Sequence, residues 1–219
     1  GFFVLWTPGV GGFLFAAAVT ISIVIHEFGH AVPSKLYGLH PSILLHGFGG
    51  LCMHDPADSD WKDILIIVAG PLVEIIFGLA AFAVLGFTAS PPGVTMNWEL
   101  FLFYFAWVSV LWGAINLLLP LFPLDGGQLF HMLLRRFLKE DRAQSIALRT
   151  SILVAIPIGI FALVKGFFFG AFLVAFILIG NIQTLQSGAR IVGRKAKVRA
   201  SSFVKDTLQQ AETAFADED

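Results

Sequence analysis

The stretch GGFLFAAAVTISIVIHEFGHAVP, residues 11–33, carries two histidines and a glutamate near the end of an otherwise apolar run. A run of about 20 apolar residues is long enough to cross a bilayer as a helix. Residues four apart lie on one helix face, so His26 and His30 can present two imidazoles to one metal ion, with Glu27 beside them as a base for water. The stretch therefore predicts a hydrolytic metal site within a membrane helix.

The overall composition agrees with a membrane setting. Hydrophobic residues make up 57% of the chain and charged residues 13%, and the mean hydropathy is +0.81. Soluble domains carry about 25% charged residues, so we expect an integral membrane protein. Apolar windows of about 20 residues predict an all-α polytopic fold of about five transmembrane helices. These spans are expected near residues 11–33, 64–87, 99–120, 146–164 and 166–187.

The distribution of basic residues predicts the orientation of these spans. Of the 14 Lys and Arg residues, all but Lys165 fall on one side of five alternating spans. Cytoplasmic loops collect Lys and Arg, so segments 34–63 and 121–145 and the C-terminus are predicted to be cytoplasmic. The metal site would then lie close to the cytoplasmic side. The compactness of the chain favours a bacterial cell membrane.

A hydrolytic zinc ion normally takes a third protein ligand, and two acidic residues lie within or beside the spans. Asp125 follows the third span in the stretch PLFPLDGG, residues 120–127, where prolines and glycines break the helix and can aim a carboxylate inward. The alternative is a solvated Asp in a helix-ending turn. Glu74 interrupts the second span, where it could tune the metal site, transfer a proton or pair with a buried donor.

Four short motifs follow one another along the chain: HEFGH at 26–30, AGP at 69–71, NLL at 116–118 and PLDGG at 123–127. Together they resemble the site-2 protease family of intramembrane zinc metalloproteases over about residues 11–138. The resemblance implies that His26, His30 and Asp125 bind Zn²⁺ and that Glu27 is the catalytic base. It implies that Asn116 holds the substrate or the reacting carbonyl, and that the substrate is a transmembrane segment of another protein, as in regulated intramembrane proteolysis.

The segment 34–63 is rich in glycine and apolar residues and is neither a span nor a polar loop. We expect a short interfacial hairpin that contains Gly49 and Gly50. Its open strand edge could bind an unwound substrate through backbone hydrogen bonds. The alternative is a loop that only covers the site.

Four segments are predicted along the chain. Residues 1–10 would be an extracytoplasmic leader or the remnant of an upstream span, and 11–138 the metalloprotease core. Residues 139–187 would add two transmembrane helices, and 188–219 a cytoplasmic tail. We expect the lipid bilayer and a transmembrane protein substrate as partners and no nucleic acid, while the oligomeric state stays open. A membrane metal transporter and an inactive protease-like scaffold are the alternative functions.

Overall fold

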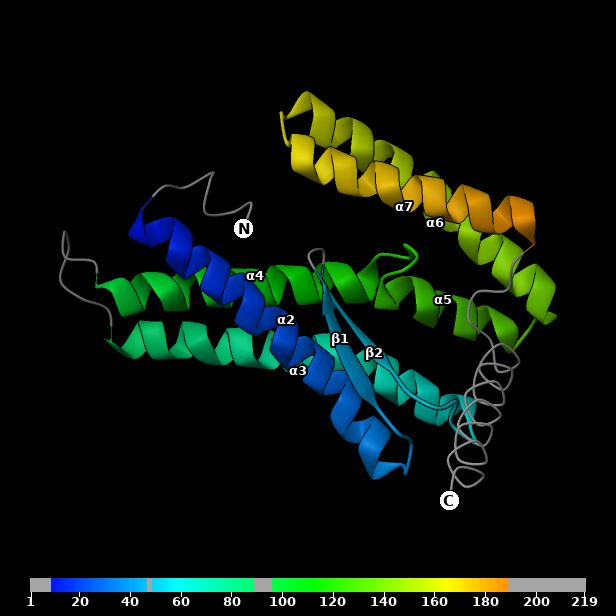
Figure 1. The fold of residues 1–219 in the computed structure, drawn as a ribbon, viewed down its shortest axis with the longest axis horizontal. Helices are drawn as coiled ribbons and strands as arrows, with labels where there is room; N and C mark the ends of the chain where they lie inside the picture. Colours follow the sequence, from blue (N-terminus) through cyan, green and yellow to red (C-terminus); the bar gives the residue numbers. More distant parts are fainter. Residues whose placement is uncertain (1–8, 47–48, 89–95, 189–219) are drawn as a thin grey trace, which may run out of the picture.

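The structure is a computed structural model that describes residues 9–46, 49–88 and 96–188. The described part contains six helices and one two-stranded hairpin (Figure 1). In chain order the elements are α2 (Val10–Leu36), β1 (Ser42–His46), β2 (Gly49–Met53), α3 (Asp60–Thr88), α4 (Asn97–Leu118), α5 (Asp125–Arg135), α6 (Glu140–Val164) and α7 (Phe168–Ser187).

All of these helices except α5 are long and apolar enough to cross a membrane. The predicted all-α polytopic fold with five spans and a short hairpin is therefore confirmed. The predicted leader and tail lie almost wholly outside the described residues.

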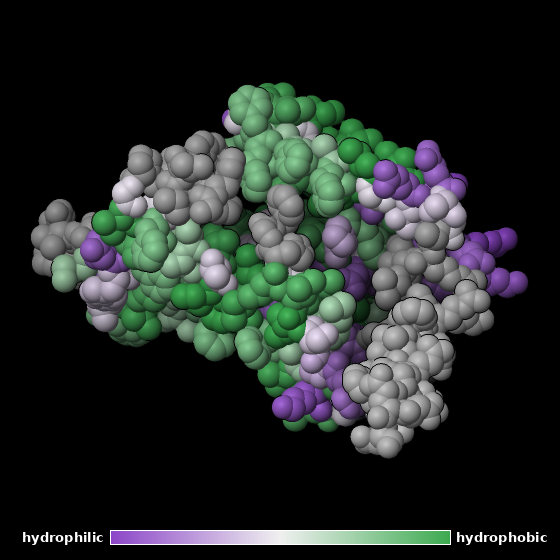
Figure 2. Space-filling model, in the orientation of Figure 1, coloured by the Kyte–Doolittle hydropathy of each residue, from purple (hydrophilic) through white to green (hydrophobic). Residues whose placement is uncertain are grey.

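The surface of the five long helices is that of a protein surrounded by lipid. Large apolar side chains point outward along each of them; examples are Phe13 (66% exposed), Phe87 (91%), Phe103 (47%), Leu153 (73%) and Phe176 (66%). The fully buried positions include small polar residues, such as Ser22, Ser109 and Ser151. Helices in lipid associate through small residues and interhelical hydrogen bonds, because lipid removes the hydrophobic drive for association. Figure 2 shows apolar surface over most of the visible face and polar side chains gathered toward the end where α5 meets α6.

Helices α2, α3 and α4 pack together as one body (Figure 1), and glycines set how closely they approach. A Cβ at Gly29 of α2 would lie 2.7 Å from the Cα of Gly70 on α3. A Cβ at Gly113 of α4 would lie 3.0 Å from the carbonyl oxygen of Pro71. Only a hydrogen atom fits at these positions, so glycine lets the backbones come close enough for buried side chains to meet between the helices.

The end of α2 turns the chain into the hairpin. Gly38 has φ +74°, and its N–H donates to the Lys35 carbonyl while the N–H of Leu39 donates to the Ser34 carbonyl. This is the Schellman arrangement, for which glycine is favoured because the conformation is left-handed. The antiparallel strands then pair from Ser42 with Met53 to His46 with Gly49, and the hairpin lies alongside α2.

Helices α6 and α7 form an antiparallel pair that stands beside the three-helix body (Figure 1). Among the described elements, α5 is the one that α6 contacts besides α7. Helix α6 begins at Glu140, earlier than the expected start of the span at 146, because its first turns are polar and hydropathy windows detect only the apolar part. Helix α4 ends at Leu118, two residues before Pro120, which cannot continue a helix.

Candidate metal centre

Three of the sequence-predicted residues meet at one buried point. The Nε2 atoms of His26 and His30 lie 3.1 Å apart, and the Asp125 Oδ2 atom lies 3.1 Å from the first and 3.4 Å from the second. All three residues are 6–7% exposed. Ligand atoms about 2.0–2.1 Å from a tetrahedral zinc ion lie roughly 3.3–3.4 Å from one another. These three atoms therefore have the spacing that one metal ion requires, and together they form a donor set that can hold it.

The outer nitrogen of each imidazole faces an acceptor. The Nδ1 atom of His30 lies 2.7 Å from the Ile66 carbonyl oxygen on α3, and the Nδ1 atom of His26 lies 2.8 Å from Glu74 Oε2. A proton on each Nδ1 satisfies these acceptors and leaves a lone pair on each Nε2. The Nε2 atom of His30 then faces two acceptors, which are His26 Nε2 and Asp125 Oδ2. A buried lone pair that faces other lone pairs fits a bound cation.

The turn after α4 brings Asp125 back to the histidines. The Asn116 Nδ2 group donates to Asp125 Oδ2 at 2.9 Å and to His26 Nε2 at 3.1 Å. Gly126 and Gly127, which follow in the first turn of α5, pack directly on the backbone of residues 117–122, where a Cβ would overlap it. The two glycines thus allow α5 to fold tightly against the end of α4, which places the carboxylate beside the histidines.

Glu27 lies beneath the hairpin. It is 5% exposed, a backbone N–H of Cys52 on β2 donates to its carboxylate, and its Oε2 atom has no hydrogen-bond partner among the described residues. A Cβ at Gly50 would overlap the Glu27 side chain. No atom of the described residues would lie within 4 Å of a Cβ at Gly49, but its φ of +151° is disfavoured for other residues. The hairpin glycines therefore let β2 lie directly over this carboxylate.

Glu74 lies on the side of the His26 ring away from Asp125. It is fully buried, and Ser22 Oγ donates to its Oε1 atom at 2.6 Å. Ser22 also lies 2.9 Å from Ser109 Oγ on α4. Neither serine was predicted from the sequence to lie at the site. Ser22 could have been found, because it precedes His26 by four residues and therefore shares its helix face.

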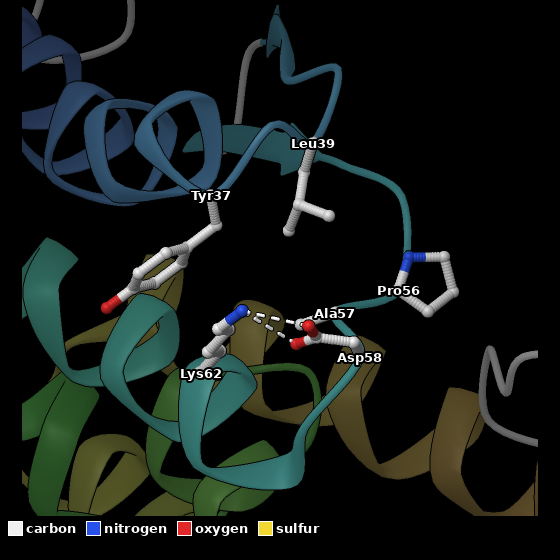
Figure 3. A pocket seen from close by; sticks show the side chains of 6 residues that line it. All are labelled: Tyr37, Leu39, Pro56, Ala57, Asp58 and Lys62. Carbon is white, nitrogen blue, oxygen red and sulfur yellow. Dashed lines mark hydrogen bonds and ion pairs between the residues drawn. The ribbon is translucent and has the colours of Figure 1, made fainter.

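A separate cavity of about 290 Å³ lies where α2 ends and α3 begins (Figure 3). It is lined by Tyr37, Leu39, Pro56, Ala57, Asp58 and Lys62. Figure 3 shows the Lys62 ammonium group turned toward Asp58, which it contacts at 2.9 Å, and the ammonium also lies 5.3 Å from the centre of the Tyr37 ring. None of the metal-ligand candidates lines this cavity, so it is distinct from the buried donor set.

The chain is similar in sequence to several known proteins. It is 32% identical over 117 residues to a zinc metalloprotease of Methanocaldococcus jannaschii, a match that covers 53% of this chain and 33% of that protein. It is 31% identical over 144 residues to stage IV sporulation protein FB of Bacillus subtilis, covering 64% of this chain and 47% of the relative. The chain thus spans a third to a half of the length of these relatives.

The fold is similar to a solved structure as well. The site-2 protease from Methanocaldococcus jannaschii superposes with a TM-score of 0.66 at 24% identity, covering 87% of this chain and 84% of the other. The family model of peptidase family M50 matches residues 14–158, a range that contains the HEFGH helix, Asp125 and most of α6. Because this match covers well over half of the sequence, the chain belongs to peptidase family M50.

Proposed function

We propose that this chain is a zinc endopeptidase that cleaves a transmembrane segment of another membrane protein within the bilayer. In this proposal His26, His30 and Asp125 bind Zn²⁺ and Glu27 is the catalytic base. The single observation that carries it is the convergence of three buried acceptor atoms, 3.1–3.4 Å apart, on helices apolar enough to cross a membrane. Membership of a peptidase family and the names of the relatives support zinc as the metal.

Zinc and Glu27 have different roles in the proposed hydrolysis. Zinc, when bound, supplies a Lewis acid that polarises the scissile carbonyl and acidifies a water molecule. Glu27 takes the proton from the water as its oxygen bonds to the carbonyl carbon, and delivers that proton to the leaving nitrogen as the C–N bond breaks. The unpartnered Oε2 atom of Glu27 is suited to this task, because no hydrogen bond in the described part of the chain has to be broken first.

Asn116 has a place in the proposed site because its amide reaches both His26 and Asp125. We propose that it orients the ligands in the resting site and donates to the substrate carbonyl during hydrolysis. A side-chain N–H directed at a developing oxyanion is a common source of transition-state stabilisation.

The proposed substrate is an unwound membrane segment. A helix hides its carbonyls in internal hydrogen bonds, so small or helix-destabilising residues near the cleaved bond should favour attack. In the described part of the chain β2 pairs with β1 alone, and its Gly50 lies against Glu27. An extended substrate could therefore bind beside β2 close to the base. The excess of basic residues on one side of the spans supports a cytoplasm-proximal site, with a bacterial cell membrane as the proposed location.

The deciding experiment is Glu27→Gln in the purified full chain, with zinc content and cleavage of a membrane-spanning substrate measured together. We expect zinc to be retained and cleavage to fall at least a hundredfold, the usual contribution of a general base. Glu99→Gln is the matched control, because Glu99 is also a buried acid in a span but lies at the start of α4, where it caps the helix. Unchanged cleavage by Glu27→Gln would refute the assigned base, and zinc flux into vesicles without cleavage would favour a transporter.

A further inference from the structure

Glu74 is a fully buried acid to which the proposed reaction assigns no role. Burying its carboxylate costs desolvation free energy. Its side chain is 0% exposed and sits on α3 between α2 and α4. Oε1 accepts a hydrogen bond from Ser22 Oγ at 2.6 Å, and Oε2 faces His26 Nδ1 at 2.8 Å. Acidic groups inside a bilayer are costly and generally functional. A residue that is buried this completely needs a compensating charge.

In the described part of the chain, no lysine or arginine supplies this compensating charge. Within residues 9–46, 49–88 and 96–188, His26 is the ionisable side chain that pairs with Glu74. On the opposite edge of the same ring lies Asp125, a second carboxylate. Two carboxylates therefore flank one imidazole in a low-dielectric region, and a divalent cation at the Nε2 side would balance them with its two positive charges.

The two histidines differ in the acceptor that their Nδ1 atoms face. For His30 this is the neutral carbonyl oxygen of Ile66 at 2.7 Å, whereas for His26 it is the carboxylate of Glu74 at 2.8 Å. A carboxylate is the stronger acceptor, and its hydrogen bond makes the nitrogen across the ring a better ligand for a metal ion. It also fixes the tautomer, because the proton must sit on Nδ1 and the lone pair on Nε2.

The hydrogen bonds around Glu74 form a chain that holds it in place. Ser22 uses its single O–H to donate to Glu74, so the 2.9 Å contact between Ser22 and Ser109 must be donated by Ser109. The chain therefore runs from α4 through α2 to α3 and ends on His26. Gly113 makes room for it, since a Cβ there would lie 3.3 Å from Glu74 Oε2.

We propose that Glu74 is a positioning residue for the metal: it orients His26 through Nδ1 and supplies the second negative charge that balances bound zinc. This inference rests on the proposed function, because it assumes that His26 and Asp125 bind zinc. It assigns to Glu74 a function in retaining metal and no contact with the substrate. A Gln at this position would keep the size and an acceptor for Nδ1 but would remove the charge.

The test is Glu74→Gln in the full chain in detergent, with the zinc dissociation constant measured by competition with a chelator. We expect zinc affinity to fall 10–100-fold, the usual effect of losing a carboxylate behind a metal-binding His. The melting temperature of the metal-free protein should be unchanged or higher, since a buried charge is removed. Ser109→Ala should weaken zinc binding less than Glu74→Gln, because it removes only the far end of the hydrogen-bond chain.

Glu99→Gln is the matched control and should leave the affinity for zinc unchanged. A zinc affinity of Glu74→Gln within twofold of wild type would overturn the inference. A loss of stability as large in the metal-free protein as in the zinc-loaded protein would also overturn it, because it would assign Glu74 to packing. These outcomes are distinct from a failure of the proposed function, in which the wild-type chain would bind no zinc or His26→Ala would bind it as well as wild type.

Discussion

The peptide groups of Phe122, three residues before Asp125, are held by side chains from α6 and α7. The Phe122 N–H donates to Ser151 Oγ at 2.9 Å, and Asn181 Nδ2 donates to the Phe122 carbonyl at 3.2 Å and to Ser151 Oγ at 2.7 Å. Ser151 is 0% exposed and Asn181 6%. Because Phe122 is only 5% exposed, its N–H and carbonyl need partners within the protein, and these two side chains supply them. We predict that Asn181→Ala and Ser151→Ala destabilise the protein and weaken its hold on zinc.

The magnitude follows from the number of bonds that each change removes. Hydrogen bonds between membrane helices are worth about 0.6 kcal/mol on average and about 1.7 kcal/mol at most. Asn181→Ala removes two bonds, so the free energy of unfolding should fall by about 1–3 kcal/mol. Ser151→Ala also removes two, one of which is the bond shared with Asn181. The double variant should therefore lose less than the sum of the single losses, by at least about 0.5 kcal/mol.

The assay is denaturant unfolding of the zinc-loaded protein in mixed micelles, run for both single variants and the double variant. Thr184→Ala is the control on the same helix, since its exposed hydroxyl donates to the Gly180 carbonyl one turn away and not to the Phe122 loop. Its effect should stay within about 0.5 kcal/mol. Strictly additive losses, or losses no larger than that of Thr184→Ala, would refute the reasoning that one buried network holds the loop.

Two glycine substitutions test how closely the elements approach at the site. Gly70→Ala should reduce bound zinc, measured by metal analysis, because the new methyl group would overlap the ring of His30; an unchanged metal content would contradict the close crossing of α2 and α3. Gly50→Ala should slow substrate cleavage while zinc is retained, because its methyl group would overlap Glu27; normal cleavage would mean that the hairpin yields easily. Gly180→Ala is the control for both, since no atom within residues 9–46, 49–88 and 96–188 would lie within 4 Å of its methyl group.

Much of the fold can be predicted from the sequence because a lipid bilayer restricts the structures that can cross it. Every backbone group in the bilayer core must be bonded internally, so a long apolar run predicts a helix with few alternatives. The five spans were expected to within a few residues, apart from the start of α6. That helix begins six residues before the expected start at 146, since Glu140 and its neighbours continue the helix as polar residues that a hydropathy window excludes.

The partner of Glu74 could not be predicted in the same way. The residue is 48 positions from His26 in the chain, and its carboxylate reaches the ring only because α2 and α3 cross where Gly29 meets Gly70. The sequence shows that a buried acid needs a partner but gives no register between two helices. The role of Ser151 and Asn181 could not be predicted for the same reason. In the sequence they are polar residues within apolar spans, and only the structure places the loop before Asp125 beside them.

The candidate ligands are held by hydrogen bonds that come from different parts of the protein. His26 and His30 are held from behind by α3, through Glu74 and the Ile66 carbonyl, while the loop before Asp125 is held by α6 and α7. Among the described elements, α6 and α7 contact the three-helix body through α5, whose first residue is Asp125 itself. Asp125 is also bonded to Asn116 of α4, so a metal ion bound by all three side chains would strengthen an existing link between α5 and the three-helix body. It follows that loss of the metal should loosen the packing between them, and that changes in α6 and α7, which carry no ligand, should still alter zinc affinity.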